Sequence, residues 1–169
     1  MGQPITSKQY FRTLTIIFYA LIVGQIMMIA VAFFSPYFMG EVIANAKEQM
    51  YITLGVSFIC VLGFSVSRAI FKNKLKRLSQ QENLAEKMHK YLSLNITKYA
   101  IFEGCSFCAA IATLLTGETI LLTFSILMLM LVFVDRPSNY KAIKDLQLSR
   151  EDAQKIQNPE EIISFMQDE

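Results

Sequence analysis

One acidic residue, Glu103, lies inside a long apolar stretch of the sequence. A carboxyl group in such a stretch costs about 2.5–3.5 kcal/mol on membrane-insertion scales, so it usually marks a partner, a proton site or an ion site. At helical spacing, Glu103 shares a stripe with small and polar side chains, which are Tyr99, Ser106, Ala110, Thr113 and Gly117. We therefore predict a proton- or ion-binding site at Glu103, with Gln25, Ser106 and Tyr99 as the other candidate residues.

Glu103 also has a purely structural explanation. Lys98 precedes it by five residues, which is about 7.5 Å along a helix. Glu103 would then lie near the end of the apolar stretch, where its side chain could reach water or pair with Lys98. Deeper in the stretch it would need a polar partner, and Ser57, Ser67 and Thr123 are candidates besides Gln25. The sequence leaves packing and ion binding open.

Cys105 and Cys108 form a Cys-x-x-Cys pair in the same stretch, and Cys60 stands in another. Membrane thiol oxidoreductases use such pairs, usually with a second pair that passes electrons onward. Because the chain has only three cysteines, we interpret them as small packing residues. A thiol oxidoreductase is the less favoured alternative.

The sequence contains no phosphate loop, dinucleotide motif or nucleophile elbow. Two thiols without a nearby histidine do not complete a zinc site. We therefore expect no enzymatic activity, no cofactor and no bound metal.

Four apolar blocks must position these residues. The chain has 169 residues, of which 53% are hydrophobic and 18% are charged. The blocks cover residues 13–34, 51–71, 94–116 and 119–134. Because backbone groups inside a bilayer find no water to bond, uncharged runs of this length must be helical. The sequence predicts an all-α fold, with an integral membrane four-helix bundle over residues 1–136.

The basic residues predict the orientation of the bundle. They gather before the first block and between the second and third blocks, whereas residues 35–50 contain only Lys47. Since Lys and Arg concentrate in cytoplasmic connections, we expect both termini and the middle connection to be cytoplasmic.

The middle connection is itself predicted to be a helical hairpin extension. Its apolar residues recur at helical spacing, and they are Leu75, Leu78, Ala85, Met88, Leu92, Ile96 and Tyr99. We expect the second helix to continue to about Leu78, followed by a reversal at Ser79-Gln80. Ser79 and Glu82 have the spacing of a capping box that would start the next helix.

Residues 137–169 form an acidic tail beside this basic connection. Ser149 and Asn158 have the pattern of residues that start short helices. We expect the tail to fold back on the hairpin, and a solvated tail is the alternative. The basic run after the second block offers contacts to anionic lipid head groups or to a partner, through Lys72, Lys74, Lys76 and Arg77.

The first and third blocks align without gaps at an offset of 80 residues, pairing Gly24 with Gly104 and Ala30 with Ala110. A duplicated helical hairpin would explain this match, and so would the general similarity of apolar helices. Duplicated repeats in one orientation occur in transporters.

The run from Ala100 to Ala109 places a carboxylate three residues after a small residue, followed by small apolar residues. It resembles the carboxylate helix of rotary ATP synthase proteolipid subunits. Over its full length the chain resembles small four-helix bacterial inner-membrane proteins of unassigned function, which share an Ala-x-x-Glu-Gly element and a Leu-Leu-Thr-Gly end, here Leu114 to Gly117. The second resemblance implies location in a cell inner membrane.

These features favour a non-enzymatic membrane protein that is an accessory, scaffold or assembly subunit of a larger complex. The expected partners are the lipid bilayer, anionic lipid heads and a membrane protein or second copy of the chain, with no nucleic acid. The alternative is a proton- or ion-handling protein in which Glu103 carries the charge, helped by Gln25 and Ser106.

Overall fold

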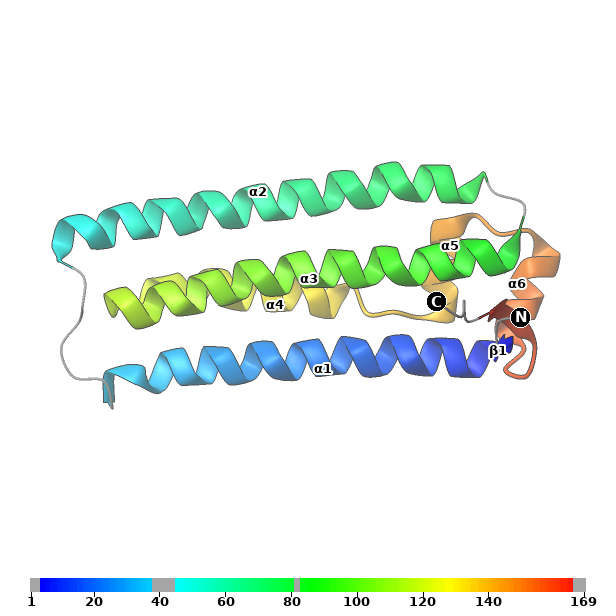
Figure 1. Cartoon of the computed structure of the whole chain (residues 1–169), viewed down its shortest axis with the longest axis horizontal. Helices are drawn as coiled ribbons and strands as arrows, with labels where there is room; N and C mark the ends of the chain where they lie inside the picture. Colours follow the sequence, from blue (N-terminus) through cyan, green and yellow to red (C-terminus); the bar gives the residue numbers. More distant parts are fainter. Residues whose placement is uncertain (1–3, 38–44, 81–82, 166–169) are drawn as a thin grey trace. The chain divides into compact units, whose positions relative to one another are not determined.

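The computed structural model describes residues 4–37, 45–80 and 83–165, and these residues fold almost entirely into helices (Figure 1). The elements in chain order are β1 (Pro4–Thr6), α1 (Ser7–Phe34), η1 (Ser35–Tyr37), α2 (Ala46–Ser79), α3 (Leu84–Thr116), η2 (Thr119–Leu121), α4 (Leu122–Val134), α5 (Asn139–Leu146), α6 (Arg150–Gln157) and β2 (Ile162–Phe165). The predicted all-α class is confirmed, with one small two-stranded sheet in addition.

Three helices, α1, α2 and α3, are long and apolar enough to cross a membrane. The fourth predicted span forms η2 and α4, which pass the same test only together with α5, from which they are bent by 85°. Alone, residues 119–134 cover about 24 Å along a helix, which is less than the roughly 30 Å hydrocarbon core of a bilayer. Three long apolar helices are therefore established, and a fourth span stays a proposal.

Local signals end the helices where the sequence predicted. Helix α1 ends at Phe34, before the Ser-Pro pair, and α4 ends at Val134. Helix α3 ends at Thr116 because Gly117 adopts a positive φ of 70°, a conformation that glycine takes without steric cost. The Gly117 N–H donates to the Thr113 carbonyl at 2.8 Å, which closes the last turn.

The predicted capping box at the tip of the hairpin is wrong. Ser79 is the last residue of α2, and its hydroxyl donates to the Lys76 carbonyl at 2.9 Å. Glu82 lies outside the described residues. Asn83 takes the capping role for α3, because its Oδ1 accepts from the Ala85 N–H at 3.0 Å. The predicted helical hairpin itself, with α2 reaching Ser79, is confirmed.

The chain divides into two compact units. The terminal unit comprises Met1–Tyr19, Ala69–Lys98 and Arg136–Glu169, and the apolar unit comprises Ala20–Arg68 and Tyr99–Asp135. The basic hairpin and the acidic tail therefore belong to the same unit.

In the terminal unit the two ends of the chain are joined. Strands β1 and β2 pair antiparallel, with Pro4 opposite Phe165. The first N–H groups of α1 have no partner within their own helix, and tail carbonyls accept from them: Ser7 donates to Glu161 at 2.9 Å and Lys8 to Pro159 at 3.1 Å. The helix predicted to start at Asn158 is wrong, because this segment turns and then forms β2.

Buried phenols connect α3 to α1 and to the tail. Tyr10 donates to the Met88 carbonyl at 2.7 Å, and Tyr91 donates to Asp145 at 3.0 Å. Burial raises the pKa of both phenols, which keeps them protonated as donors. The tail therefore folds back on the hairpin, as the charge pattern predicted.

The buried face of α3 in this unit differs from the predicted stripe. Leu92 and Ile96 are only half-buried, whereas Tyr91 and Asn95 are buried. The Asn95 amide donates to the Tyr91 carbonyl at 2.9 Å, so its burial leaves that donor satisfied.

We expect Ile156→Ala to loosen the tail. Ile156 is fully buried, and truncating a buried isoleucine costs about 2–5 kcal/mol. Trypsin cleavage after Arg150 and Lys155, followed by mass spectrometry of detergent-solubilised protein, should become faster. The control is Gln154→Ala, because Gln154 is exposed on the same helix. Equal cleavage rates in the two variants would contradict the described packing of α6.

Candidate functional site

Glu103 lies on α3 in the apolar unit, with its side chain half-buried against α1. A Cβ atom added to Gly24 would lie 3.4 Å from the Glu103 Oε1, so the carboxyl group rests against the backbone of α1. The nearest basic residue along α3, Lys98, is buried with its ammonium 4.2 Å from the centroid of the Phe71 ring. A cation over an aromatic face is a favourable contact.

Gln25 follows Gly24 and is fully buried. Neither its Oε1 nor its Nε2 has a hydrogen-bond partner among the described residues, and the buried Ser67 hydroxyl also has none. A buried polar group without a partner costs about 1–3 kcal/mol, so such groups in native proteins require an explanation. Gln25 is thus the candidate site residue whose polar atoms find no partner in the described part of the chain.

Ser106 and Tyr99 contact a different helix. The Ser125 hydroxyl donates to the Ser106 carbonyl at 2.7 Å, and the Ser106 hydroxyl lies 3.4 Å from the Ser125 carbonyl. Tyr99 donates to the Asp135 carbonyl at 2.8 Å, at the end of α4. These two hydroxyls join α3 to α4, whereas Glu103 lies toward α1.

Two of the other candidate partners of Glu103 are engaged elsewhere or exposed, whereas Ser67 is buried without a partner among the described residues. Ser57 donates to the Thr53 carbonyl of its own helix at 2.7 Å. Thr123 is exposed on α4. Of the predicted small and polar stripe on α3, Tyr99, Ser106, Ala110 and Thr113 are all buried.

The cysteines form a contact between α2 and α3. The Cys60 Sγ lies 3.8 Å from the Cys105 carbonyl, and the Cys105 Sγ lies 3.8 Å from the Ile59 carbonyl. Cys105 is buried and Cys108 is exposed, and all three thiols are free. The two residues of the Cys-x-x-Cys pair therefore occupy different environments.

Gly63 is a residue whose role the sequence did not reveal. A Cβ atom at this position would overlap the Cys105 sulfur, whereas a Cβ at Gly55 on the same helix would meet nothing within 4 Å. A side chain at position 63 would therefore have to displace the Cys105 sulfur, or α2 would have to move away from α3. Nothing in the spacing of the glycines separates the two positions, because the contact depends on another helix.

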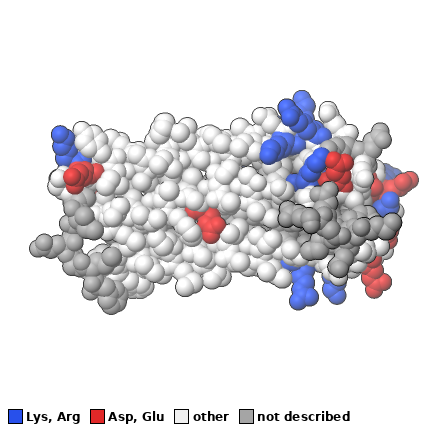
Figure 2. Space-filling model, viewed as in Figure 1, with Lys and Arg blue, Asp and Glu red and all other residues white. Residues whose placement is uncertain are grey.

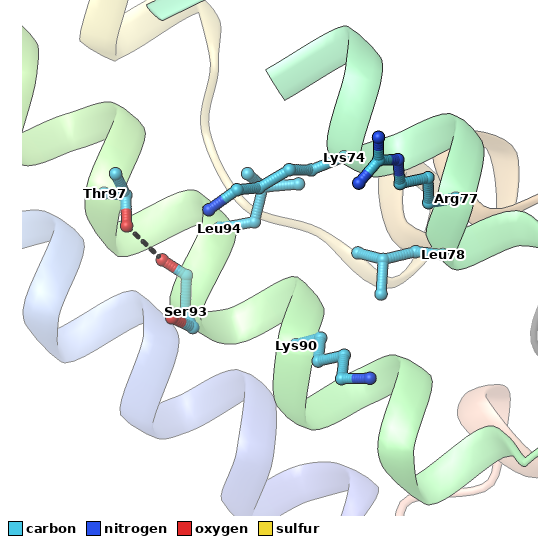
Figure 3. Close-up of a pocket in the computed structure, with 7 residues that line it drawn as sticks. All are labelled: Lys74, Arg77, Leu78, Lys90, Ser93, Leu94 and Thr97. Carbon is cyan, nitrogen blue, oxygen red and sulfur yellow. Dashed lines mark hydrogen bonds between the residues drawn. The ribbon is translucent and has the colours of Figure 1, made fainter. Parts of the chain in front are cut away.

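The basic run in the terminal unit divides into two faces of α2. Lys74 and Arg77 line a pocket of about 330 Å³ with residues of α3 (Figure 3). Lys72 and Lys76 line another pocket, of about 670 Å³, together with Asp145 and Gln147 from the tail. Figure 2 shows Lys and Arg side chains gathered over this part of the hairpin. The four residues predicted as one lipid or partner contact thus belong to two different surfaces.

The described residues contain no group of three or more His, Cys, Asp or Glu side chains that could hold a metal ion. The chain matches no protein-family model, no curated protein and no solved structure. The resemblances seen in the sequence and the duplicated hairpin stay predictions.

We expect Gly63→Ala to destabilise the apolar unit by about 1–3 kcal/mol, because the added Cβ would have to displace the buried Cys105 sulfur from its present position. Gly55→Ala is the matched control on α2 and should change stability by about 1 kcal/mol or less. Thermal unfolding in detergent measures both variants. Adding Cys105→Ala to Gly63→Ala removes the overlapping sulfur and should restore part of the loss. Equal stability of the two single variants would contradict this helix contact.

Proposed function

We propose that the chain is a non-enzymatic integral membrane protein, serving as an accessory, scaffold or assembly subunit of a larger membrane complex. Its partners are the bilayer and a membrane protein, or a second copy of the chain, and no nucleic acid is involved. This function requires apolar surface beyond what the chain buries within itself.

The observation that carries the proposal is the uneven burial of the three long helices. Half of the apolar window of α3 is buried, against 22% for α1 and 17% for α2. The uncovered surface includes large side chains such as Phe58 (64% exposed), Leu54 (61%) and Met27 (64%). Figure 2 shows a broad field of uncharged side chains. Exposed apolar surface on this scale is typical of contact with lipid or with another membrane protein.

The hydrogen bonds of the polar side chains in the apolar unit favour a structural role for them over a catalytic or ion-binding role. Hydroxyl groups form the hydrogen bonds of the α3–α4 contact, and they belong to Ser106, Ser125 and Tyr99. Thr113 and Thr116 donate to carbonyls of their own helix at 3.1 and 2.8 Å. Ser125 and Ser106 form hydrogen bonds to one another across α3 and α4, and these bonds support α4 as the fourth helix of the proposed bundle.

The proposed location is a cell inner membrane, with both termini cytoplasmic. Pairing of β1 with β2 holds the two ends of the chain in one unit, which supports placing both ends on the same side of a membrane. Lys and Arg concentrate in the α2–α3 hairpin of that unit, and this enrichment favours the cytoplasmic side. The choice of an inner membrane rests on the resemblance to small bacterial membrane proteins.

Site-specific photocrosslinking tests the proposal. We expect benzoylphenylalanine at position 58, which is exposed on α2, to capture one defined membrane protein or a second copy in intact membranes. The same probe at Phe102, which is buried beside Phe64, should react only within the chain. Size measurement in mild detergent should show the same companion in a fixed ratio. A monomer that crosslinks only to lipid would refute the subunit proposal.

A second candidate function is proton or ion handling at Glu103. It is favoured by the buried Gln25 amide, which has no partner among the described residues and follows the glycine against which Glu103 lies. A carboxyl group and an amide oxygen are suitable ligands for a proton or a hard cation.

Carbodiimide labelling separates the two functions, because apolar carbodiimides react with protonated carboxyl groups in lipid-accessible positions. Ion handling predicts rapid labelling of Glu103 at pH 7 that a specific cation slows, with Glu118, exposed after α3, as the unreactive control. The subunit function predicts that Glu103→Gln reduces copurification of the companion without changing ion flux in vesicles. Cation-independent labelling together with unchanged flux would exclude the second candidate.

A further inference from the structure

A small pocket in the terminal unit combines basic, hydroxyl and apolar groups. It has a volume of about 330 Å³ and lies between α2 and α3. Its lining consists of Lys74, Arg77 and Leu78 from α2, and Lys90, Ser93, Leu94 and Thr97 from α3. We propose that this pocket binds the phosphate of an anionic phospholipid head group, an inference that rests on the membrane location proposed above.

The basic groups at the pocket suit a phosphate. Lys74 and Arg77 are three residues apart on α2 and therefore share one face, and Figure 3 shows the Lys74 side chain extending over Leu94 with the Arg77 guanidinium on the side of Lys74. Arg offers a planar fork of donors that matches phosphate oxygens, and Lys adds a point charge. Lys90 on α3 forms an ion pair with Glu86, so Lys74 and Arg77 supply the main attraction.

The remaining lining suits the rest of a lipid head. Leu78 and Leu94 are buried and give the pocket an apolar floor, where the glycerol and first acyl carbons can pack. Ser93 and Thr97 are exposed at its edge. The Thr97 hydroxyl donates to the Ser93 carbonyl at 2.9 Å, which leaves the Ser93 hydroxyl as the donor for a phosphate or glycerol oxygen.

The position of the pocket along α2 matches the depth of lipid head groups. The apolar block of α2 ends at Phe71. Lys74 and Arg77 follow it by about 4.5 and 9 Å along the helix. Each head-group layer of a bilayer is about 5–8 Å thick. A lipid whose chains lie along the apolar part of α2 would therefore place its phosphate near these two residues.

The opposite basic face of α2 is a weaker candidate for anion binding, because an acidic residue lines its pocket. Lys72 and Lys76 line their pocket together with the Asp145 carboxylate of α5, which opposes binding of an anion. None of the described residues that line the Lys74–Arg77 pocket is acidic. The two faces carry the same number of basic residues on the same helix, so each is a control for the other.

The test compares Lys74→Gln/Arg77→Gln with Lys72→Gln/Lys76→Gln, which remove equal charge. Native mass spectrometry in mild detergent measures binding of phosphatidylglycerol and of phosphatidylcholine with the same acyl chains. We expect the full-length wild type to prefer phosphatidylglycerol. The Lys74/Arg77 variant should lose roughly tenfold or more in affinity for it, since each basic residue near an anionic lipid contributes to binding. The Lys72/Lys76 variant should lose less than about threefold.

Three results would overturn the proposal. Equal losses in the two double variants would indicate nonspecific attraction to the whole basic hairpin. If the wild type showed no preference for phosphatidylglycerol, an anionic lipid head group would be excluded as the ligand of the pocket. Binding of glycerol 3-phosphate that depends on Lys74 and Arg77, without preference among lipids, would assign the pocket to a soluble phosphate ester. Failure of membrane insertion would appear separately, as wild-type protein absent from the membrane fraction.

Discussion

Close approach of the neighbouring helices to α3 is the contact on which the apolar unit depends. In lipid the hydrophobic effect does not drive helices together, so van der Waals contact between small residues must do so. Gly63 lets α2 approach the Cys105 sulfur, and a Cβ at Gly24 would lie 3.4 Å from the Glu103 Oε1, in van der Waals contact. Ala110 of α3 packs with Ala32 of α1 and Leu122 of α4. Many large apolar side chains of α1 and α2, such as Met27 and Phe58, are left on the outer surface.

This arrangement restricts where chemistry could occur. On the α4 side of α3, serine and tyrosine hydroxyls bond across the interface, and their polarity is used in packing. On the α1 side, the Glu103 carboxyl group lies against Gly24, and the next residue, Gln25, is a buried amide with no partner in residues 4–37, 45–80 and 83–165. Packing alone does not compensate the cost of that amide. We therefore expect any ligand that binds through polar groups to bind on the α1 side of α3. Such a ligand could be a second copy of the chain, a partner helix or a cation.

The sequence predicted most helix ends, which depend on neighbouring residues, and missed several contacts that depend on distant ones. Proline after Phe34 and glycine after Thr116 end their helices through local backbone preferences, and Glu103 and Gln25 were recognisable by residue type. Hydropathy favoured Leu92 and Ile96 as core residues, but Tyr91 is buried instead, and its hydroxyl donates a hydrogen bond to Asp145 of the tail. Strand β2 was missed because its partner β1 lies at the opposite end of the chain.

The acidic tail gives the basic hairpin two unequal faces. Helical spacing alone separates Lys72 and Lys76 from Lys74 and Arg77, but it cannot say which pair the tail will approach. That choice follows from α5, which the Ser138 cap starts and the Tyr91–Asp145 hydrogen bond attaches to α3. With Asp145 beside Lys72 and Lys76, the electrostatic attraction for an external anion is concentrated at Lys74 and Arg77. The fold of the tail thus leaves Lys74 and Arg77 as the face of the basic run that is better suited to bind an anion.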